Sequence, residues 1–214
     1  MRRSPLPWLL TLAVVAATPL ATADAKPRKK SACQKLAAKH RDRSPHPRLV
    51  LAVRGDSDVG DIAACVLPRG RVRRLARWDD GLGRAGGGIV ATRGYHVLIS
   101  ESWGDQYGGT SETLRHVDAR TRRSTTIAGY GCQLHYSQPA CPEGTTYGKL
   151  VLHRSGAGAI ELTDLATGAT SLESFDPRGA LARLDAGPVD ALRIEVAEIV
   201  WVRAGLERRA PLPQ

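Results

Sequence analysis

From Arg48 onward, apolar residues come in short runs that are rich in valine, isoleucine and leucine and are separated by turn-forming residues. Runs of this length with β-branched residues are typical of β-strands. The runs lie at residues 49–53, 62–67, 89–92, 96–100, 113–117, 124–128, 149–153, 159–162, 192–196 and 198–202, and a last strand is expected at 206–212, after a turn at 203–205. No stretch after residue 48 has the period of a long amphipathic helix. The sequence therefore predicts an all-β domain over residues 48–214, with a loop or a weak helical turn at 172–184.

Before this domain, the sequence predicts one short helix at residues 31–39. Ser31 is a good N-cap, and the residues from Gln34 to Lys39 are good helix formers. Pro45 and Pro47 would end the helix, because proline cannot continue it.

The first 25 residues have the three zones of a secretory signal peptide. Arg2 and Arg3 precede the apolar run 8–17, and small residues follow as far as Ala25. A membrane anchor is the alternative, but a spanning helix needs about 20 apolar residues and this run is about half as long. We expect cleavage after Ala25 and secretion of residues 26–214, with cleavage after Ala23 as the alternative.

Export changes how the four cysteines are interpreted. An even number of cysteines in an oxidising compartment is typical of disulfides, and the spacings here do not match a zinc site. Three pairings are open. We favour Cys33–Cys65, which would tie the N-terminal segment to the β domain, together with Cys132–Cys141.

Residues 26–47 form a strongly basic leader in a chain whose formal net charge is +10. Clustered cations near a terminus attract polyanions in a salt-dependent way. We expect Lys26, Arg28, Lys29 and Lys30 to contact an anionic envelope polymer, such as a teichoic acid or an acidic glycan, or lipid headgroups. The alternative is a solvated tail in an arginine-rich chain.

Compact apolar runs begin near Leu49, Val97, Leu150 and Ile199, about 50 residues apart. An aspartate begins the turn at 164–168, in which threonine and glycine follow, and Asp118 begins a similar turn without the glycine. A period near 50 with several strands per unit is typical of β-propellers. The chain resembles secreted β-propeller-like repeat proteins of the actinobacterial type, whose function is uncharacterised. The resemblance implies about four antiparallel repeats in a propeller-like array, and no particular activity.

Two segments carry aromatic residues outside the predicted strands. Trp103 and Tyr107 lie in a glycine-rich segment, and Tyr136 lies between Cys132 and Cys141. Exposed aromatic residues on loops favour recognition, and a disulfide would reduce the entropy lost on binding. These three aromatic residues are the predicted binding residues.

Signatures of catalysis are weak. Ser155 is the nearest approach to a nucleophile elbow, and its surroundings indicate a hairpin turn. No motif for a metal or cofactor stands out, and five percent aromatic residues argues against a base-stacking surface for nucleic acid.

The sequence predicts an exported, non-enzymatic binding or scaffold protein. The alternative is an extracellular hydrolase with its site on one face of the β array. The oligomeric state and the ligand are not predicted.

Overall fold

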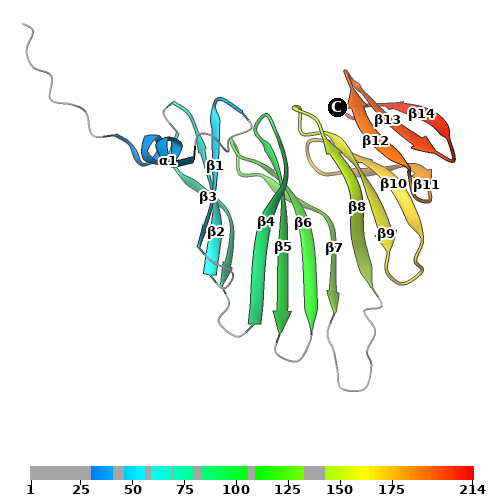
Figure 1. Ribbon diagram of the computed structural model, residues 1–214, viewed down its shortest axis with the longest axis horizontal. Coiled ribbons are helices and arrows are strands. Elements are labelled where there is room, and N and C mark those ends of the chain that lie inside the picture. Colours follow the sequence, from blue (N-terminus) through cyan, green and yellow to red (C-terminus); the bar gives the residue numbers. More distant parts are fainter. Residues whose placement is uncertain are drawn as a thin grey trace, which may run out of the picture.

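A computed structural model describes residues 30–40, 46–55, 59–68, 70–79, 83–105, 109–132 and 143–214. These residues form one helix, α1 (Ala32–His40), and three antiparallel sheets, which confirms the predicted all-β class (Figure 1). The strands follow one another in chain order within each sheet, so the fold is a meander: β1–β3, then β4–β11, then β12–β14.

The strands have the following bounds. β1 spans Leu49–Gly55, β2 Val59–Val66, β3 Arg73–Asp79, β4 Gly83–Arg93, β5 His96–Asp105, β6 Thr110–Asp118, β7 Ser124–Cys132, β8 Gly144–Leu152, β9 Gly158–Asp164, β10 Thr170–Phe175, β11 Leu181–Ala186, β12 Ala191–Glu195, β13 Glu198–Arg203 and β14 Leu206–Pro211.

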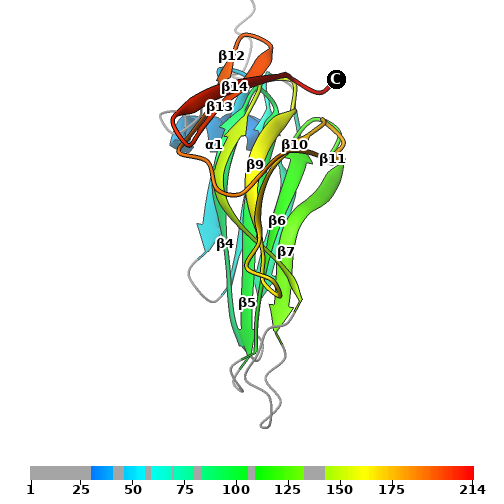
Figure 2. The same ribbon diagram turned by 90° about the vertical axis from the view of Figure 1, so that its right-hand side faces the viewer.

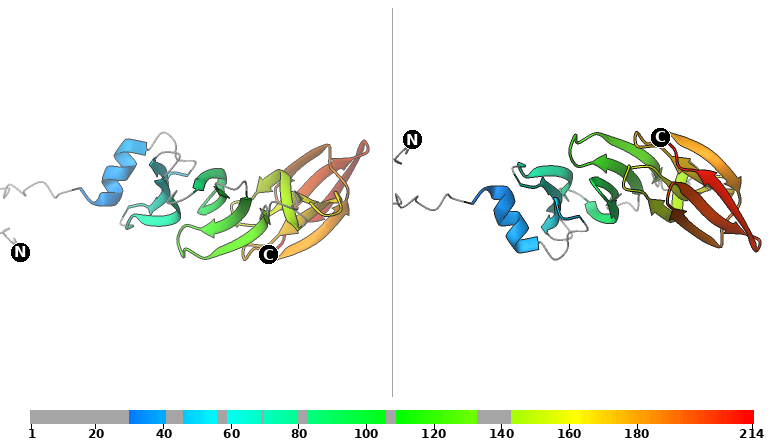
Figure 3. Two further views of the ribbon diagram at one scale, coloured as in Figure 1. Left: turned by 90° about the horizontal axis from the view of Figure 1, so that it is seen from below. Right: turned by 90° about the horizontal axis from the view of Figure 1, so that it is seen from above.

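The sheets stack as layers because strand side chains alternate between two faces. On β5, Val97 and Ile99 pack against the β1–β3 sheet, whereas Leu98 packs against the strands that follow β7. On β9, Ile160 faces the β5–β6 layer and Ala159 faces the β12–β14 sheet. Each of these side chains is fully buried, which contributes roughly 1.5–3 kcal/mol for the larger ones. Figure 3 shows the layers side by side along the long axis.

The eight-stranded sheet is folded over itself between β7 and β8. These two strands pair over only two residue pairs, Gly129 with Thr145 and Tyr130 with Gly144. The fold brings Leu114 of β6 and Phe175 of β10 into one core cluster. Strands β4–β7 therefore form one layer and β8–β11 the next. Figure 2 shows that the long axes of the strands in the two layers have nearly the same direction.

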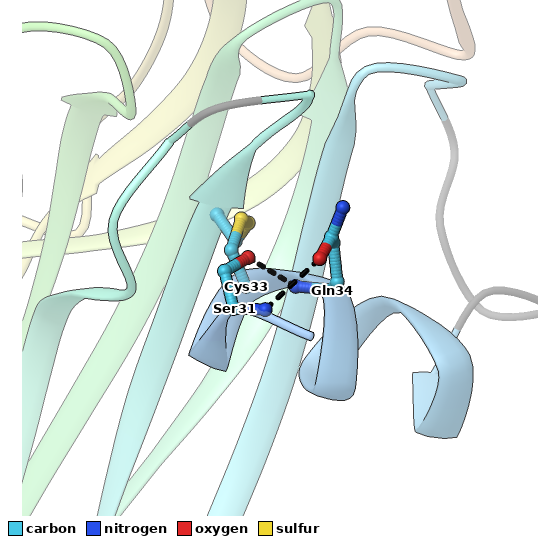
Figure 4. The surroundings of a disulfide bond; sticks show 4 residues. Ser31, Cys33 and Gln34 are labelled. Atoms are coloured by element: carbon cyan, nitrogen blue, oxygen red, sulfur yellow. Dashed lines mark hydrogen bonds between the residues drawn. A yellow bond between two sulfur atoms is a disulfide. The ribbon is translucent and has the colours of Figure 1, made fainter. Parts of the chain in front are cut away.

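Helix α1 covers the outer face of the β1–β3 sheet. Ser31 Oγ accepts the N–H of Gln34, and Gln34 Oε1 accepts the N–H of Ser31, so a capping box begins the helix (Figure 4). Cys33 is bonded to Cys65 of β2, with their Cα atoms 5.7 Å apart. Both the predicted helix and this predicted disulfide are confirmed.

The stack remains open among the described strands. The β1–β3 and β12–β14 sheets lie at opposite ends of it and do not meet to close a ring (Figure 3).

The outer face of the last sheet carries a network of charged side chains. Arg193 and Arg209 form ion pairs there with Glu195, Glu198 and Glu207.

Two predictions about the strands were wrong. Residues 172–184 contain most of β10 and part of β11 rather than a loop or helical turn. The turns that begin at Asp118 and Asp164 join β6 to β7 and β9 to β10, so the alternation of strand directions places them at opposite edges of the folded sheet. The similarity between these turns therefore does not mark equivalent places in successive repeats.

Within the described part of the chain, no helix is long and apolar enough to cross a membrane.

Candidate functional site

Four hairpin turns of the folded sheet lie at the same end of the molecule, because alternate turns of a meander share an edge. They join β4 to β5, β6 to β7, β8 to β9 and β10 to β11, at the upper end in Figure 1. Every one of these turns carries arginine. The group, here called the arginine edge, consists of Arg93, Arg120, Arg122, Arg123, Arg154 and Arg178, all of which are exposed.

Two of the turns use the same local device to present an arginine. Asp118 Oδ1 accepts the backbone N–H of Arg120 at 2.8 Å, and Asp176 Oδ1 accepts that of Arg178 at 2.7 Å. An aspartate that bonds the backbone two residues on closes the turn and leaves the second residue at its tip. The β8–β9 turn is closed in a similar way by His153 Nδ1, which accepts the N–H of Ser155 at 3.2 Å, and Arg154 lies between these two residues.

The arginine edge carries charge that the protein does not neutralise. Of its six guanidinium groups, only that of Arg120 forms an ion pair, with Asp118 at 3.2 Å, among the residues that the structure describes. Arg120 also lies over the ring of Tyr95, 5.0 Å from its centroid. The remaining five guanidiniums have no described carboxylate within 4 Å, so their charge is available to an external anion.

Two cavities open beside this edge. The larger, of about 690 Å³, lies between β4, β8 and β12, and Arg93, Arg154 and Arg193 contribute to its lining. The smaller, of about 390 Å³, is here called the histidine cavity. His96 and His116 line it, together with Arg120, Arg123 and Arg178 of the edge.

The two histidines form a buried pair. His116 Nε2 and His96 Nδ1 are 3.2 Å apart, and the rings stack with centroids separated by 5.2 Å. Burial lowers the pKa of both, and for His116 the additional repulsion from His96 brings the pKa to about 4. Both imidazoles are therefore neutral at pH 7. Gly156 is required beside them, because its φ is +95° and a Cβ there would lie 2.5 Å from His96 Nδ1.

Asp118 keeps its charge within this cationic surrounding. Burial opposes its ionisation, but the hydrogen bonds from the side chain and backbone of Arg120 outweigh that effect and lower the pKa of Asp118. The carboxylate in turn offsets part of the effect of burial on His96.

Of the predicted aromatic binding residues, only Trp103 lies among the described residues. It belongs to β5 rather than to a loop, and it is 47% exposed. It lies near the end of β5, toward the edge of the sheet opposite the arginine edge. Tyr107, Tyr136 and Cys141 lie outside the described residues, as does the side chain of Cys132, so the Cys132–Cys141 pairing stays a prediction.

Of the predicted polyanion contacts, Lys30 is described and exposed, two residues before α1 begins. Lys26, Arg28 and Lys29 lie outside the described residues. The disulfide between Cys33 of α1 and Cys65 near the end of β2 holds α1 at the same end of the stack as the arginine edge.

The contact between Ser155 and His153 is part of a turn. Ser155 Oγ lies 2.9 Å from His153 Nδ1, but the same nitrogen also accepts the backbone N–H of Ser155. Among the described residues no carboxylate bonds the other nitrogen of His153, so no third group orients this pair as nucleophilic catalysis requires. Nor does any group of three or more histidine, cysteine or acidic residues in the described chain suit a metal ion.

A scan against models of protein families finds no match to this chain, and a search of curated proteins finds no match either.

Proposed function

We propose that this chain is an exported binding protein whose arginine edge holds an acidic polymer of the cell envelope. The observation that carries the proposal is the set of five edge arginines without a carboxylate partner in the described structure. Arginine presents several N–H groups in a planar fork that matches carboxylate and phosphate oxygens. A row of such groups on separate turns suits a ligand that is itself extended and repeatedly charged.

The N-terminal region supports the proposed location. Arg2, Arg3 and the apolar run 8–17 would direct export, and the Cys33–Cys65 disulfide suits an oxidising compartment. The basic leader, including Lys30, would add non-specific attraction to the same polymer.

The proposal is of binding and not of catalysis. Guanidinium groups bind anions, but they remain protonated at physiological pH and so cannot act as general bases.

We also propose that the likeness to propeller-like repeat proteins holds in an open form. The layers β4–β7 and β8–β11 would be two complete four-stranded units, and the β1–β3 and β12–β14 sheets two shorter ones. The first strands of three units, β4, β8 and β12, jointly line the larger cavity, as the inner strands of propeller blades line a channel.

The test uses the mature chain, residues 26–214, and a variant with one arginine removed from each of three turns. In Arg122→Gln, Arg154→Gln and Arg178→Gln combined, we expect affinity for an immobilised acidic polymer to fall on the order of 100-fold, at about 1 kcal/mol per lost cation. A poly(glycerol phosphate) and a polyuronate serve as probes, and anionic vesicles test for a lipid surface instead.

A matched control removes three exposed cations from other parts of the described surface: Arg77→Gln, Lys149→Gln and Arg183→Gln. It has the same net charge as the edge variant, and we expect it to bind the polymers as the unmodified chain does. Equal losses in the two variants would show that only net charge matters and would overturn the proposal. Strong vesicle binding with no polymer binding would also overturn it.

A further inference from the structure

The histidine cavity has a structure that simple attraction of a polyanion does not require. It lies beneath the tips of the arginine edge, and its volume of about 390 Å³ falls in the range of small-ligand sites, roughly 300–1,000 Å³. His96 and His116 in it are 5% and 2% exposed. Two buried polar rings in place of apolar ones reduce the stability of the fold, because their desolvation is compensated by only one shared hydrogen bond.

The shared hydrogen bond determines what the neutral pair offers to a ligand. One ring donates to the other through His116 Nε2 and His96 Nδ1, and each neutral imidazole has one N–H. Whichever ring is the donor, one of the two remaining nitrogens carries an N–H and the other a lone pair. Among the described residues, no group bonds these two nitrogens.

The other polar groups of the cavity come from several separate elements. Thr121 and Arg123 belong to the β6–β7 turn, Thr125 to β7, Ser155 to the β8–β9 turn and Arg178 to the β10–β11 turn. Asp118 and Arg120 also line the cavity, but they form an ion pair with each other, so the unpaired charge is that of Arg123 and Arg178. Donors fixed on different elements approach the cavity from different directions. A carboxylate has two oxygens in one plane, which a single arginine fork satisfies, whereas a phosphate spreads its oxygens over a tetrahedron.

We propose that the histidine cavity is a subsite for one phosphate group of a phosphodiester polymer. This proposal rests on the proposed function, because it assigns the chemical class of the polymer that the arginine edge binds. Arg123 and Arg178 supply the charge, and the hydroxyls of Thr125 and Ser155 supply neutral hydrogen bonds. The histidine pair supplies an N–H from below. Carboxylate polymers bind the edge without occupying the cavity.

The first experiment follows the histidine ring C–H signals by NMR while ligands are added to the mature chain, with His96→Gln and His116→Gln used to assign the two signals. Inorganic phosphate and poly(glycerol phosphate) are expected to shift both signals in a saturable way. The polyuronate is expected to bind without shifting them. Equal shifts with the polyuronate, or no shift with either phosphate probe, would overturn the proposal.

A second variant removes two cavity hydroxyls and leaves every charge and both histidines in place. Combined Thr125→Val and Ser155→Ala is expected to reduce affinity for poly(glycerol phosphate) at least about 10-fold, the effect of one lost hydrogen bond to a charged group, and to leave polyuronate affinity unchanged. A thermal melt confirms that the variant is folded. Equal reductions for both polymers, or none, would contradict the subsite.

The two proposals fail in different ways. If the edge variant binds both polymers as the unmodified chain does, the proposed function is wrong whatever the histidines report. If the edge variant loses affinity for both polymers while the histidine signals stay unchanged in the unmodified chain, the edge binds polyanions and the phosphate subsite is wrong.

Discussion

The arginine edge and the β12–β14 sheet are both rich in arginine, but they treat its charge in opposite ways. In the β12–β14 sheet all four arginines have carboxylate partners: Arg193, Arg203, Arg208 and Arg209. At the edge, only Arg120 among six has one within the described residues.

The two regions therefore use arginine side chains in different ways. Glutamates of the last sheet pair with Arg193 and Arg209, and Asp185 of the neighbouring strand β11 pairs with Arg203 and Arg208, so charge is neutralised within the fold. At the edge the acidic residues of the turns, Asp118 and Asp176, bond the backbone. Their arginines are thereby held at the tips, with the cationic charge in excess.

Removing the acidic partner of a paired set should have the largest effect. Asp185 accepts hydrogen bonds from Trp201 Nε1 and Arg208, both at 2.8 Å, and from Arg203. Asp185→Ala leaves the buried indole N–H and two arginines unpaired. We expect it to cost about 3 kcal/mol, and to lower Tm by about 6–12 °C, without changing polymer affinity. Asp190→Ala, at an exposed position nearby, is the control, and an unchanged Tm for Asp185→Ala would contradict the assigned role.

The two regions should also respond to acid in different pH ranges. The pKa of His116 is about 4 in the folded chain against an ordinary 6.5, so the unfolded chain binds a proton between these values and the folded chain does not. The free energy of unfolding should therefore decrease by about 3 kcal/mol as pH falls from 6.5 to 4. Asp185, with a folded pKa of about 2 against 3.8, loses its contribution only below that range.

Urea unfolding at several pH values measures this decrease. His116→Gln should be less stable at pH 7 but should show a smaller decrease between pH 6.5 and pH 4, because glutamine does not titrate. An equal decrease in the variant would show that other groups cause it.

The salt dependence of binding should distinguish the two arginine sets. For the unmodified chain, the logarithm of polymer affinity should fall linearly with the logarithm of salt concentration. Combined Arg122→Gln and Arg178→Gln should reduce that slope by about one for each lost arginine, whereas combined Arg193→Gln and Arg209→Gln should leave it unchanged. Titrations between low and moderate salt give the slopes. A reduced slope in the second variant would show that the paired arginines of the last sheet also contact the polymer.

The smallest effect is expected from unpairing the surface of the last sheet. Arg193 and Arg209 are partly exposed, and exposed ion pairs contribute little to stability. Their combined replacement by glutamine should lower Tm by no more than about 3 °C, as a differential scanning measurement would show. A loss as large as that expected for Asp185→Ala would mean that this network is essential to the fold.

The sequence was sufficient for most strands and for the N-terminal attachment. Short runs rich in valine, isoleucine and leucine predicted ten of the strands, and the turn at 203–205 predicted β14 after it. Ser31, Cys33 and Cys65 behave as predicted. Strand β10 was missed because Leu172 and Phe175, three residues apart, point to opposite faces and are both buried. A strand that lies between two layers buries residues on both faces. Its sequence therefore lacks the alternation of apolar and polar residues that marks a strand with one exposed face.

The sequence predicted the separate turns of the arginine edge but not their arrangement at one edge of the sheet. Each arginine could be seen in or beside a predicted turn, but which turns share an edge depends on strand order. A missed strand reverses the assignment of every later turn, and β3, β10 and β11 were missed. The histidine cavity depends in addition on the fold between β7 and β8, which no local pattern marks.

The open stack leaves the number of layers free. In a closed ring each blade must subtend a fixed angle, so adding one blade alters the contacts of all the others. Here one end is covered by α1 and the other by charged side chains, and interior layers contact only their neighbours. A chain of this design could gain a layer by duplication of four strands with both ends unchanged, and each added layer would lengthen the row of turns by two.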